Sequence, residues 1–94
     1  MDNNIDKYTQ TAEMLKVLAH PVRLCIVEGL IKKGECNVNF MQSCLKAPQS
    51  TISQHLQKLK FAGIIEGRRE GIEIYYRITD ERVKELIKIL SKHE

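Results

Sequence analysis

The chain has 94 residues, 43% hydrophobic and 29% charged, which predicts one soluble globular domain with a modest core and excludes a disordered chain. Apolar runs span only a few residues and the first seven residues form no secretion signal, so we expect no membrane span, no export and a cytoplasmic location. The net charge is only +3, but all of the excess falls within residues 46–79, which hold six Lys and Arg against three Glu.

Two helices are predicted in the first third of the chain. The first, from about Ile5 to Ala19, carries apolar residues along one side: Ile5, Tyr8, Ala12, Leu15 and Leu18. Pro21 cannot continue that helix but suits the first turn of a second one, which extends to about Lys32 and is ended by Gly34.

The next two predicted helices stand on either side of a tight break. One covers about residues 37–45, and the other opens at Pro48 and stops near Gly63. Their apolar stripes are Val38, Met41 and Leu45 in the first and Ile52, Leu56 and Leu59 in the second. Two helices joined in this way, the second polar at its start, form a helix-turn-helix.

Short polar side chains with both donors and acceptors occupy the first turns of the fourth helix. They are Gln49, Ser50, Thr51, Ser53 and Gln54. Base edges in the major groove of duplex DNA match this chemistry, because amides pair bidentately with adenine and hydroxyls pair with several bases. His55 lies at the rim, where it packs the helix or contacts a phosphate, and Lys58 follows where phosphates would lie. The alternative for this surface is a solvated polar helix face.

A two-residue period follows and predicts an antiparallel hairpin. Ile64 and Ile65 begin its first strand, and in residues 72–78 isoleucines and Tyr76 alternate with more polar residues. Residues 68–71, Arg-Arg-Glu-Gly, are expected to form the turn, and such a hairpin beside a helix-turn-helix is a wing. Asp80 can then cap a last helix, whose apolar stripe is Val83, Leu86, Ile87 and Leu90.

The predicted fold is mostly α with a β-hairpin: one winged helix-turn-helix domain over residues 1–94, with four helices, two strands and a last helix. The first and last helices keep apolar stripes that the small core cannot cover. On a chain this short such stripes usually meet a copy of themselves. We therefore expect a homodimer through the first and last helices, with two recognition helices about one DNA turn apart on a palindromic site.

Three segments, residues 18–24 (LAHPVRL), 48–56 (PQSTISQHL) and 69–76 (REGIEIYY), resemble the ArsR/SmtB family of dimeric winged-helix repressors in order and spacing. The resemblance covers nearly the whole chain and implies regulation of transcription by DNA binding. It implies that Gln49, Ser50, Ser53 and Gln54 lie in the major groove, and that Arg68 and Arg69 lie in the wing near phosphates or the minor groove. It identifies neither an operator nor a small-molecule inducer.

The chain departs from the two metal sites of that family. Asn37-Val38-Asn39 stands where one site has Cys-Val-Cys, and amides do not replace thiolates as ligands of soft metals. Asp80 and His93 match two ligands of the other site, but Arg82 stands where a histidine is expected. We therefore expect no metal site and no cofactor.

The three cysteines make a thiol-based sensor an alternative function to consider. Cys25, Cys36 and Cys44 are odd in number and show no CxxC spacing, which indicates reduced thiols. If Cys36 and Cys44 shared one helix, they would lie about 12 Å apart, too far for a disulfide. Cys25 could approach Cys44 in the fold, so these two form the candidate redox pair. The alternative is that they are small core residues.

Other classes of function match the sequence less well. No motif pairs a nucleophile with a base, so we expect no enzyme. RNA binding would favour more exposed aromatics, and a protein interface fewer serines. The sequence predicts a DNA-binding transcriptional repressor that acts as a homodimer on a palindromic operator. A thiol- or metal-responsive sensor repressor of the same fold, or a winged-helix interaction module that does not bind DNA, are the alternatives.

Overall fold

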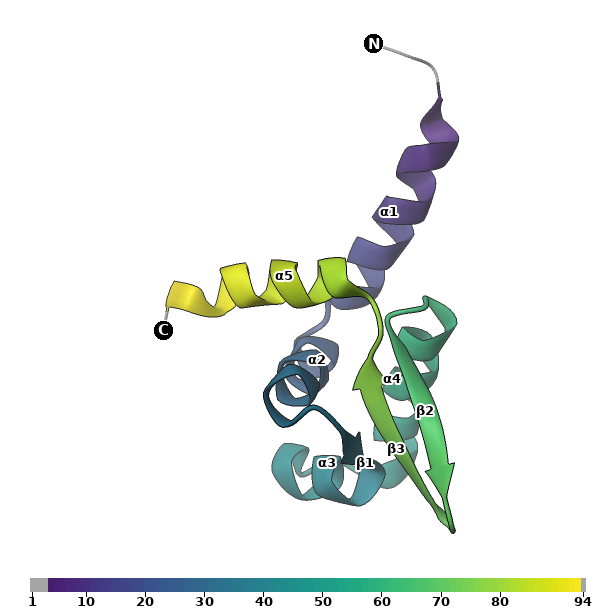
Figure 1. The fold of residues 1–94 in the computed structure, drawn as a ribbon, viewed down its shortest axis with the longest axis vertical. Helices are drawn as coiled ribbons and strands as arrows, with labels where there is room; N and C mark the ends of the chain where they lie inside the picture. The colour runs from purple at the N-terminus through teal and green to yellow at the C-terminus, as the bar shows by residue number, and fades with distance from the viewer. Residues whose placement is uncertain (1–3, 94) are drawn as a thin grey trace.

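The computed structural model describes residues 4–93 and shows a helical body flanked by an antiparallel sheet (Figure 1). The helices are α1 (Ile5–Leu18), α2 (Pro21–Lys33), α3 (Val38–Leu45), α4 (Gln49–Phe61), α5 (Glu81–Leu90) and the 3-10 turn η1 (Ser91–His93). The strands are β1 (Cys36–Asn37), β2 (Ile65–Glu70) and β3 (Glu73–Ile78). The predicted winged helix-turn-helix is confirmed. The first three residues, part of the segment used for the export prediction, lie outside the described residues.

Side chains from α2, α4, α5 and the sheet meet in one core. Val27 of α2, Ile52 and Leu59 of α4, and Ile64 just before β2 have no exposed surface. Leu56 completes the α4 stripe with only 2% of its surface exposed. Because these α4 residues recur at helical spacing, the core fixes which side of α4 points outward.

Capping side chains mark the starts of α2 and α5. His20 caps α2, because its Nδ1 accepts a hydrogen bond from the Val22 N–H at 3.1 Å. Asp80 caps α5 by accepting from the Arg82 N–H at 2.9 Å, as the sequence predicts. At the other end of α2, Gly34 has a φ of 89°, a left-handed conformation that suits glycine at a helix terminus.

The hairpin is longer than the sequence indicated. Residues 68–70 were expected in the turn but belong to β2, and the turn consists of Gly71 and Ile72. Gly71 has a φ of 65°, which a two-residue hairpin turn requires and glycine adopts without strain. Ile72 was expected in the half-buried stripe of the strand, but it lies at the tip with 94% of its surface exposed.

A short additional strand, β1, lies at one edge of the sheet. Cys36 pairs with Tyr76 and Asn37 with Tyr75, which gives the sheet order β1-β3-β2. Two residues are too few to show a periodic pattern, so this strand could not be predicted. Cys36 is thus extended and does not share a helix with Cys44, so the helical spacing considered for this pair does not apply.

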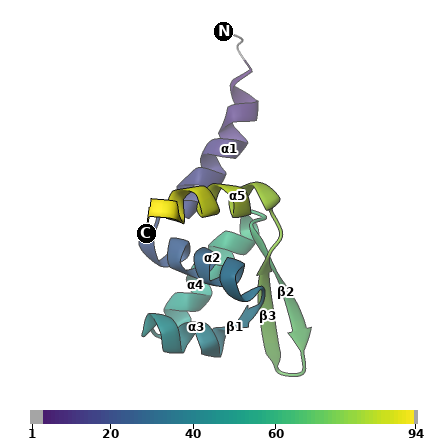
Figure 2. The same cartoon turned by 60° about the vertical axis from the view of Figure 1, so that its left-hand side comes forward.

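The two ends of the molecule present different surfaces (Figures 1 and 2). Helices α1 and α5 lie at one end, and the tip of the hairpin lies with α3 and the start of α4 at the other. Large apolar side chains stay exposed on α1 and α5: Ile5, Tyr8, Leu15, Ile89 and Leu90. No helix within residues 4–93 has the length and apolar character needed to cross a membrane.

Candidate nucleic-acid interface

The polar residues at the start of α4 lie on the surface. Gln49, Ser50 and Gln54 are exposed, and Thr51 and Ser53 are partly exposed. In the described part of the chain no side chain caps this helix, so its first backbone N–H groups face the same surface. Lys58 is exposed farther along α4. Amides, hydroxyls, N–H groups and the ammonium groups of Lys58 and Lys60, both exposed, are therefore available to a ligand on a single helix.

His55 faces the corner between α1 and α2. Its side chain is half-buried, and its Nδ1 lies 3.1 Å from Nη1 of Arg23. Its ring centroid lies 4.6 Å from that of His20. Burial lowers the pKa of His55, and the charges of His20, Arg23 and Lys58 lower it further. His55 therefore supports α4 through its packing, which was one of the two roles expected from the sequence.

Two carboxylates hold Arg68 on the hairpin. Nε and Nη2 of Arg68 donate to Glu35 at 3.2 and 2.9 Å, and Nη1 donates to Glu70 at 3.1 Å. The guanidinium carbon also lies 5.3 Å from the centroid of the Tyr75 ring. The bonds to Glu35 and then to Glu70 raise the pKa of Arg68 above its ordinary range. A phosphate would have to compete with both carboxylates for this side chain.

Arg69 leaves the hairpin on the opposite face. Arg69 is paired with Ile74 of β3. Four residues earlier in β2, Ile65 is paired with Ile78, and both of these side chains are buried in the core. Side chains alternate along a strand, so Arg69 lies on the face that covers the core and α4. Within residues 4–93 Arg69 forms no ion pair. Its guanidinium group is therefore not held by a carboxylate in the described part of the chain, in contrast to that of Arg68.

Sequence relatives agree with this geometry. A family model described as a helix-turn-helix domain matches residues 18–68, from the end of α1 into β2. The chain is 43% identical to an uncharacterized HTH-type transcriptional regulator, MJ1325, of Methanocaldococcus jannaschii, over 94% of this chain and 99% of that protein. It is 46% identical to the transcriptional repressor PagR of Bacillus anthracis, over 85% of this chain and 80% of PagR.

Solved structures with the same fold include the crystal structure of PagR, with a TM-score of 0.83 over 90% of this chain and 97% of PagR. The solution structure of the homodimeric winged helix-turn-helix domain Mb0332 of Mycobacterium bovis, described as a possible ArsR-family regulator, gives a TM-score of 0.82. That domain is 36% identical, over 96% of this chain and 82% of the domain. The chain belongs to the ArsR/SmtB family.

In this ArsR/SmtB family member, residues at the family's metal positions make other contacts. Asn37 caps α3 by accepting from the Phe40 N–H at 2.9 Å. Asp80 pairs with the Arg82 guanidinium at 3.0 Å, and this bond lowers the pKa of the Asp80 carboxyl. Among the described residues, no three His, Cys, Asp or Glu side chains come together as a metal site. The side chain of His93 lies outside that part of the structure.

The three cysteines of this family member surround one small apolar cavity. It has a volume of about 100 Å³, and Cys25 of α2, Cys36 of β1 and Cys44 of α3 all line it. Cys25 and Cys44 are exposed, whereas Cys36 is buried and burial raises the pKa of its thiol. The fold thus brings the candidate redox pair to one cavity and adds Cys36 of β1 to its lining.

Proposed function

We propose that this protein is a sequence-specific DNA-binding repressor that acts as a homodimer on a palindromic operator. One observation carries the proposal: the polar start of α4 lies with the hairpin tip at the end opposite the exposed apolar side chains of α1 and α5 (Figure 2). In this proposal, one end faces a duplex and the other faces a second copy. The similarity to PagR, named a transcriptional repressor, supports it.

In the proposed complex, the first half of α4 enters the major groove. The amides of Gln49 and Gln54 and the hydroxyls of Ser50, Thr51 and Ser53 supply donors and acceptors for base edges. Lys58 contacts the phosphate backbone, which positions the protein without reading sequence. The buried stripe of α4 keeps these side chains in a fixed orientation.

The wing supplies further phosphate contacts in this complex. Arg69 makes the principal one, because it lies on the face of the hairpin toward α4. Arg68 contributes less, because it must first exchange Glu35 and Glu70 for a phosphate. The main role of His55 in this complex is to pack α4 against Arg23 and His20, and a phosphate contact is secondary.

A second copy covers the exposed side of α1 in the proposed dimer. Ile5, Tyr8 and Leu15 have 64%, 56% and 47% of their surfaces exposed. Removing apolar surface from water is favourable by about 25 cal/mol per Å². The similar Mb0332 domain is described as homodimeric. A two-fold axis would place two α4 helices about one DNA turn apart, which matches a palindromic site.

In the proposed function the protein catalyses no reaction and acts in the cytoplasm on duplex DNA. Similar proteins named as transcriptional regulators support this role.

A thiol-responsive repressor is a second candidate, favoured by the exposed Cys25 and Cys44 at one cavity just before the recognition helix. Hydrogen peroxide would take two hydrogen atoms from their thiols, giving a disulfide and two molecules of water. The candidate requires operator affinity to change on oxidation in the wild type and not in Cys25→Ser.

Selection from a random duplex library, followed by titration of the selected site, tests the proposed function. We expect a palindromic site to be selected and to bind far more tightly than an unrelated duplex at the same salt concentration. Sedimentation should show a dimer. Equal binding to any nucleic acid, or none, would contradict the proposal and favour the interaction module.

A further inference from the structure

A single arginine joins three helices behind the recognition helix. Arg23, in the first turn of α2, donates from Nε to the backbone carbonyl of Val17 in the last turn of α1. Its Nη1 donates to Nδ1 of His55 in α4 at 3.1 Å. Carbonyls in the last turn of a helix lack helical partners, and a cation there interacts favourably with the helix dipole. The helix proposed to read DNA is thereby tied to the helix proposed to form the dimer.

These hydrogen bonds require both histidines to be neutral. Arginine has only donors, so Nδ1 of His55 must accept, and the ring proton must be on Nε2. His20 is in the same state, because its Nδ1 accepts from the Val22 N–H that it caps. The two ring centroids are 4.6 Å apart. A proton on either Nδ1 would break one hydrogen bond and place a cation beside the other ring.

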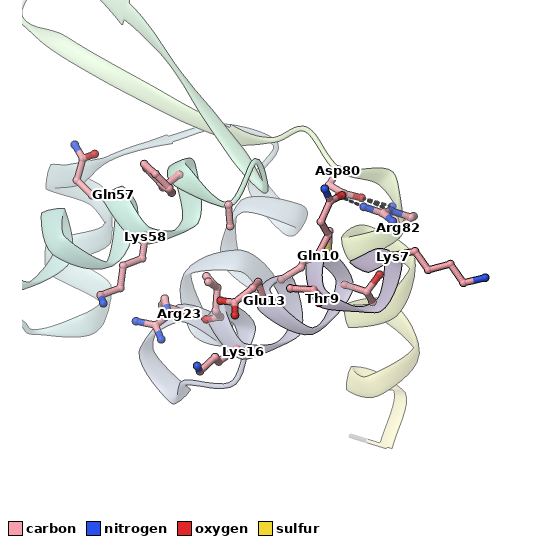
Figure 3. A pocket seen from close by; sticks show the side chains of 15 residues that line it. Lys7, Thr9, Gln10, Glu13, Lys16, Arg23, Gln57, Lys58, Asp80 and Arg82 are labelled. Carbon is pink, nitrogen blue, oxygen red and sulfur yellow. Dashed lines mark hydrogen bonds and ion pairs between the residues drawn. The ribbon is translucent and has the colours of Figure 1, made fainter. Parts of the chain in front are cut away.

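Positive groups surround the ring of His55. Arg23 contacts it, and Lys58 lies on the same helix close enough to lower its pKa, although burial is the larger cause. Lys16 and Glu13 of α1 line the groove that Arg23 and Lys58 also line (Figure 3). The other elements packed on α4 present buried apolar groups, such as Met41 of α3 and Ile65 of β2. A protonated His55 would therefore face mainly like charges.

We propose that Arg23 is a positioning residue that holds the recognition helix through neutral His55, so that operator binding weakens when this ring is protonated. The inference rests on the proposed DNA-binding function. With His55 neutral, Arg23 keeps α4 attached to the end of α1. With His55 protonated, Arg23 loses its acceptor and faces a like charge, and α4 loses this attachment.

Nitrogen NMR of the imidazole rings tests the cluster without DNA. His55 should carry its proton on Nε2 at pH 7.5 and titrate below the ordinary range for histidine. Arg23→Gln should raise this pKa, because it removes the neighbouring cation, whereas Arg23→Lys keeps a cation and should raise it less. A proton on Nδ1, or a His55 pKa unchanged in Arg23→Gln, would overturn the inference.

Operator affinity measured between pH 8 and pH 5 tests the functional consequence. Because the proposed dimer carries two copies of His55, the wild-type affinity should fall by up to about a hundredfold for each pH unit below the His55 pKa measured by NMR, which is about tenfold per protomer. In His55→Gln the profile should be flat whatever the absolute affinity, because the amide oxygen accepts from Arg23 at every pH. In His20→Asn, which retains a capping side chain, the wild-type slope should persist. An unrelated duplex serves as the control for non-specific binding.

The two experiments separate failure of the inference from failure of the proposed function. A flat wild-type profile, or a His55→Gln profile as steep as the wild type, would overturn the positioning role. If no duplex is selected at any pH, the proposed function fails, and the NMR titration still decides whether the cluster exists.

Discussion

Two adjacent arginine side chains of the wing, Arg68 and Arg69, have different surroundings. Arg68 and Arg69 are neighbours in the chain but leave β2 on opposite faces, because strand side chains alternate. Arg68 meets Glu35, which is 33 residues away, and Arg69 lies on the face toward α4. Their equal formal charges are therefore not equally available to DNA.

Substituting each arginine separately tests this difference. Arg69→Ala should weaken binding to all duplexes and reduce the salt slope of the binding constant by about two units, because each protomer of the proposed dimer loses one phosphate contact. Arg68→Ala should change the slope less, since Glu35 and Glu70 already neutralise this side chain. Titrations at several salt concentrations measure both slopes. An unchanged slope in Arg69→Ala would show that the wing does not touch the backbone.

Base readout by α4 is also tested residue by residue. Gln54→Ala should cost about 1–3 kcal/mol for each half-site of the selected operator and relax the base preference at one position of each half-site, because an amide pair is lost there. Gln57→Ala is the matched control, since Gln57 is exposed on the same helix but lines the groove beside α1. Binding to single-base variants of the operator measures the preference. Equal losses in the two variants would contradict the assignment.

The neutral state of His55 also predicts the pH dependence of folding. Its pKa is lowered in the folded protein from an ordinary value of 6.5, so the unfolded chain binds the proton more tightly. Stability from this residue is fully present above about pH 6.5 and is lost as the pH falls toward the folded pKa. Chemical unfolding of the wild type and His55→Gln should give curves that diverge below pH 6.5. Parallel curves would mean that His55 has an ordinary pKa.

The two long strands of the hairpin, β2 and β3, pack closely against each other at Gly67. Gly67 of β2 lies opposite Tyr76 of β3, on the face toward the core. A Cβ at position 67 would lie 2.9 Å from Cγ2 of Ile74 and 3.1 Å from Cε1 of Tyr76. The Ile74 side chain is β-branched and stiff, so it cannot easily move aside. The absence of a side chain at Gly67 therefore leaves room for the side chains of Ile74 and Tyr76.

A pair of glycine substitutions tests this packing. Gly67→Ala should destabilise the fold by about 1–3 kcal/mol, because the new methyl group is forced into occupied space. Gly29→Ala in α2 should stabilise it by about 1 kcal/mol, because alanine favours a helix interior and, apart from the chain neighbours and backbone of its own helix, no described atom lies within 4 Å of the new Cβ. Urea unfolding measures both. Equal stability of the wild type and Gly67→Ala would contradict the close contact.

Helices α1 and α5 lie at the end of the molecule opposite the hairpin tip and the start of α4 (Figure 1), and both helices carry large exposed apolar side chains. Helix α1 projects from the body, and of its predicted apolar stripe only Leu18 is buried. The domain is stabilised by helix caps and by the buried apolar stripe of α4, and the other residues of the predicted α1 stripe take no part in its core. The remaining apolar surface fits the proposed two-fold partner.

Introducing a carboxylate into this surface tests the dimer. Leu15→Glu should give a folded monomer, because 47% of the Leu15 surface is exposed in the single chain, and operator affinity should fall sharply. Gln10→Glu is the matched control, since Gln10 lines the groove on another side of α1. Sedimentation and operator titration measure both variants. A Leu15→Glu dimer with wild-type affinity would rule out this side of α1 as the interface.

Local signals in the chain were sufficient to predict most elements and the polar surface. The spacing of Ile52, Leu56 and Leu59 predicted α4 and thereby the outward direction of its polar residues. Asp80 predicted the start of α5. The turn was misplaced because Gly71 was taken as its last residue instead of its first. Nothing local marked β1, which exists through pairing with β3.

The sequence by itself determined the order of the five long helices and the hairpin, the family and the chemistry offered by α4, because caps, periodicity and side-chain types are local properties. Only the tertiary structure decided which charges are paired and which cysteines meet. Glu35 neutralises Arg68, Arg23 holds His55, and three thiols share one cavity, through contacts between residues far apart in the chain. Such contacts depend on how elements pack in space, and no spacing along the chain encodes them directly.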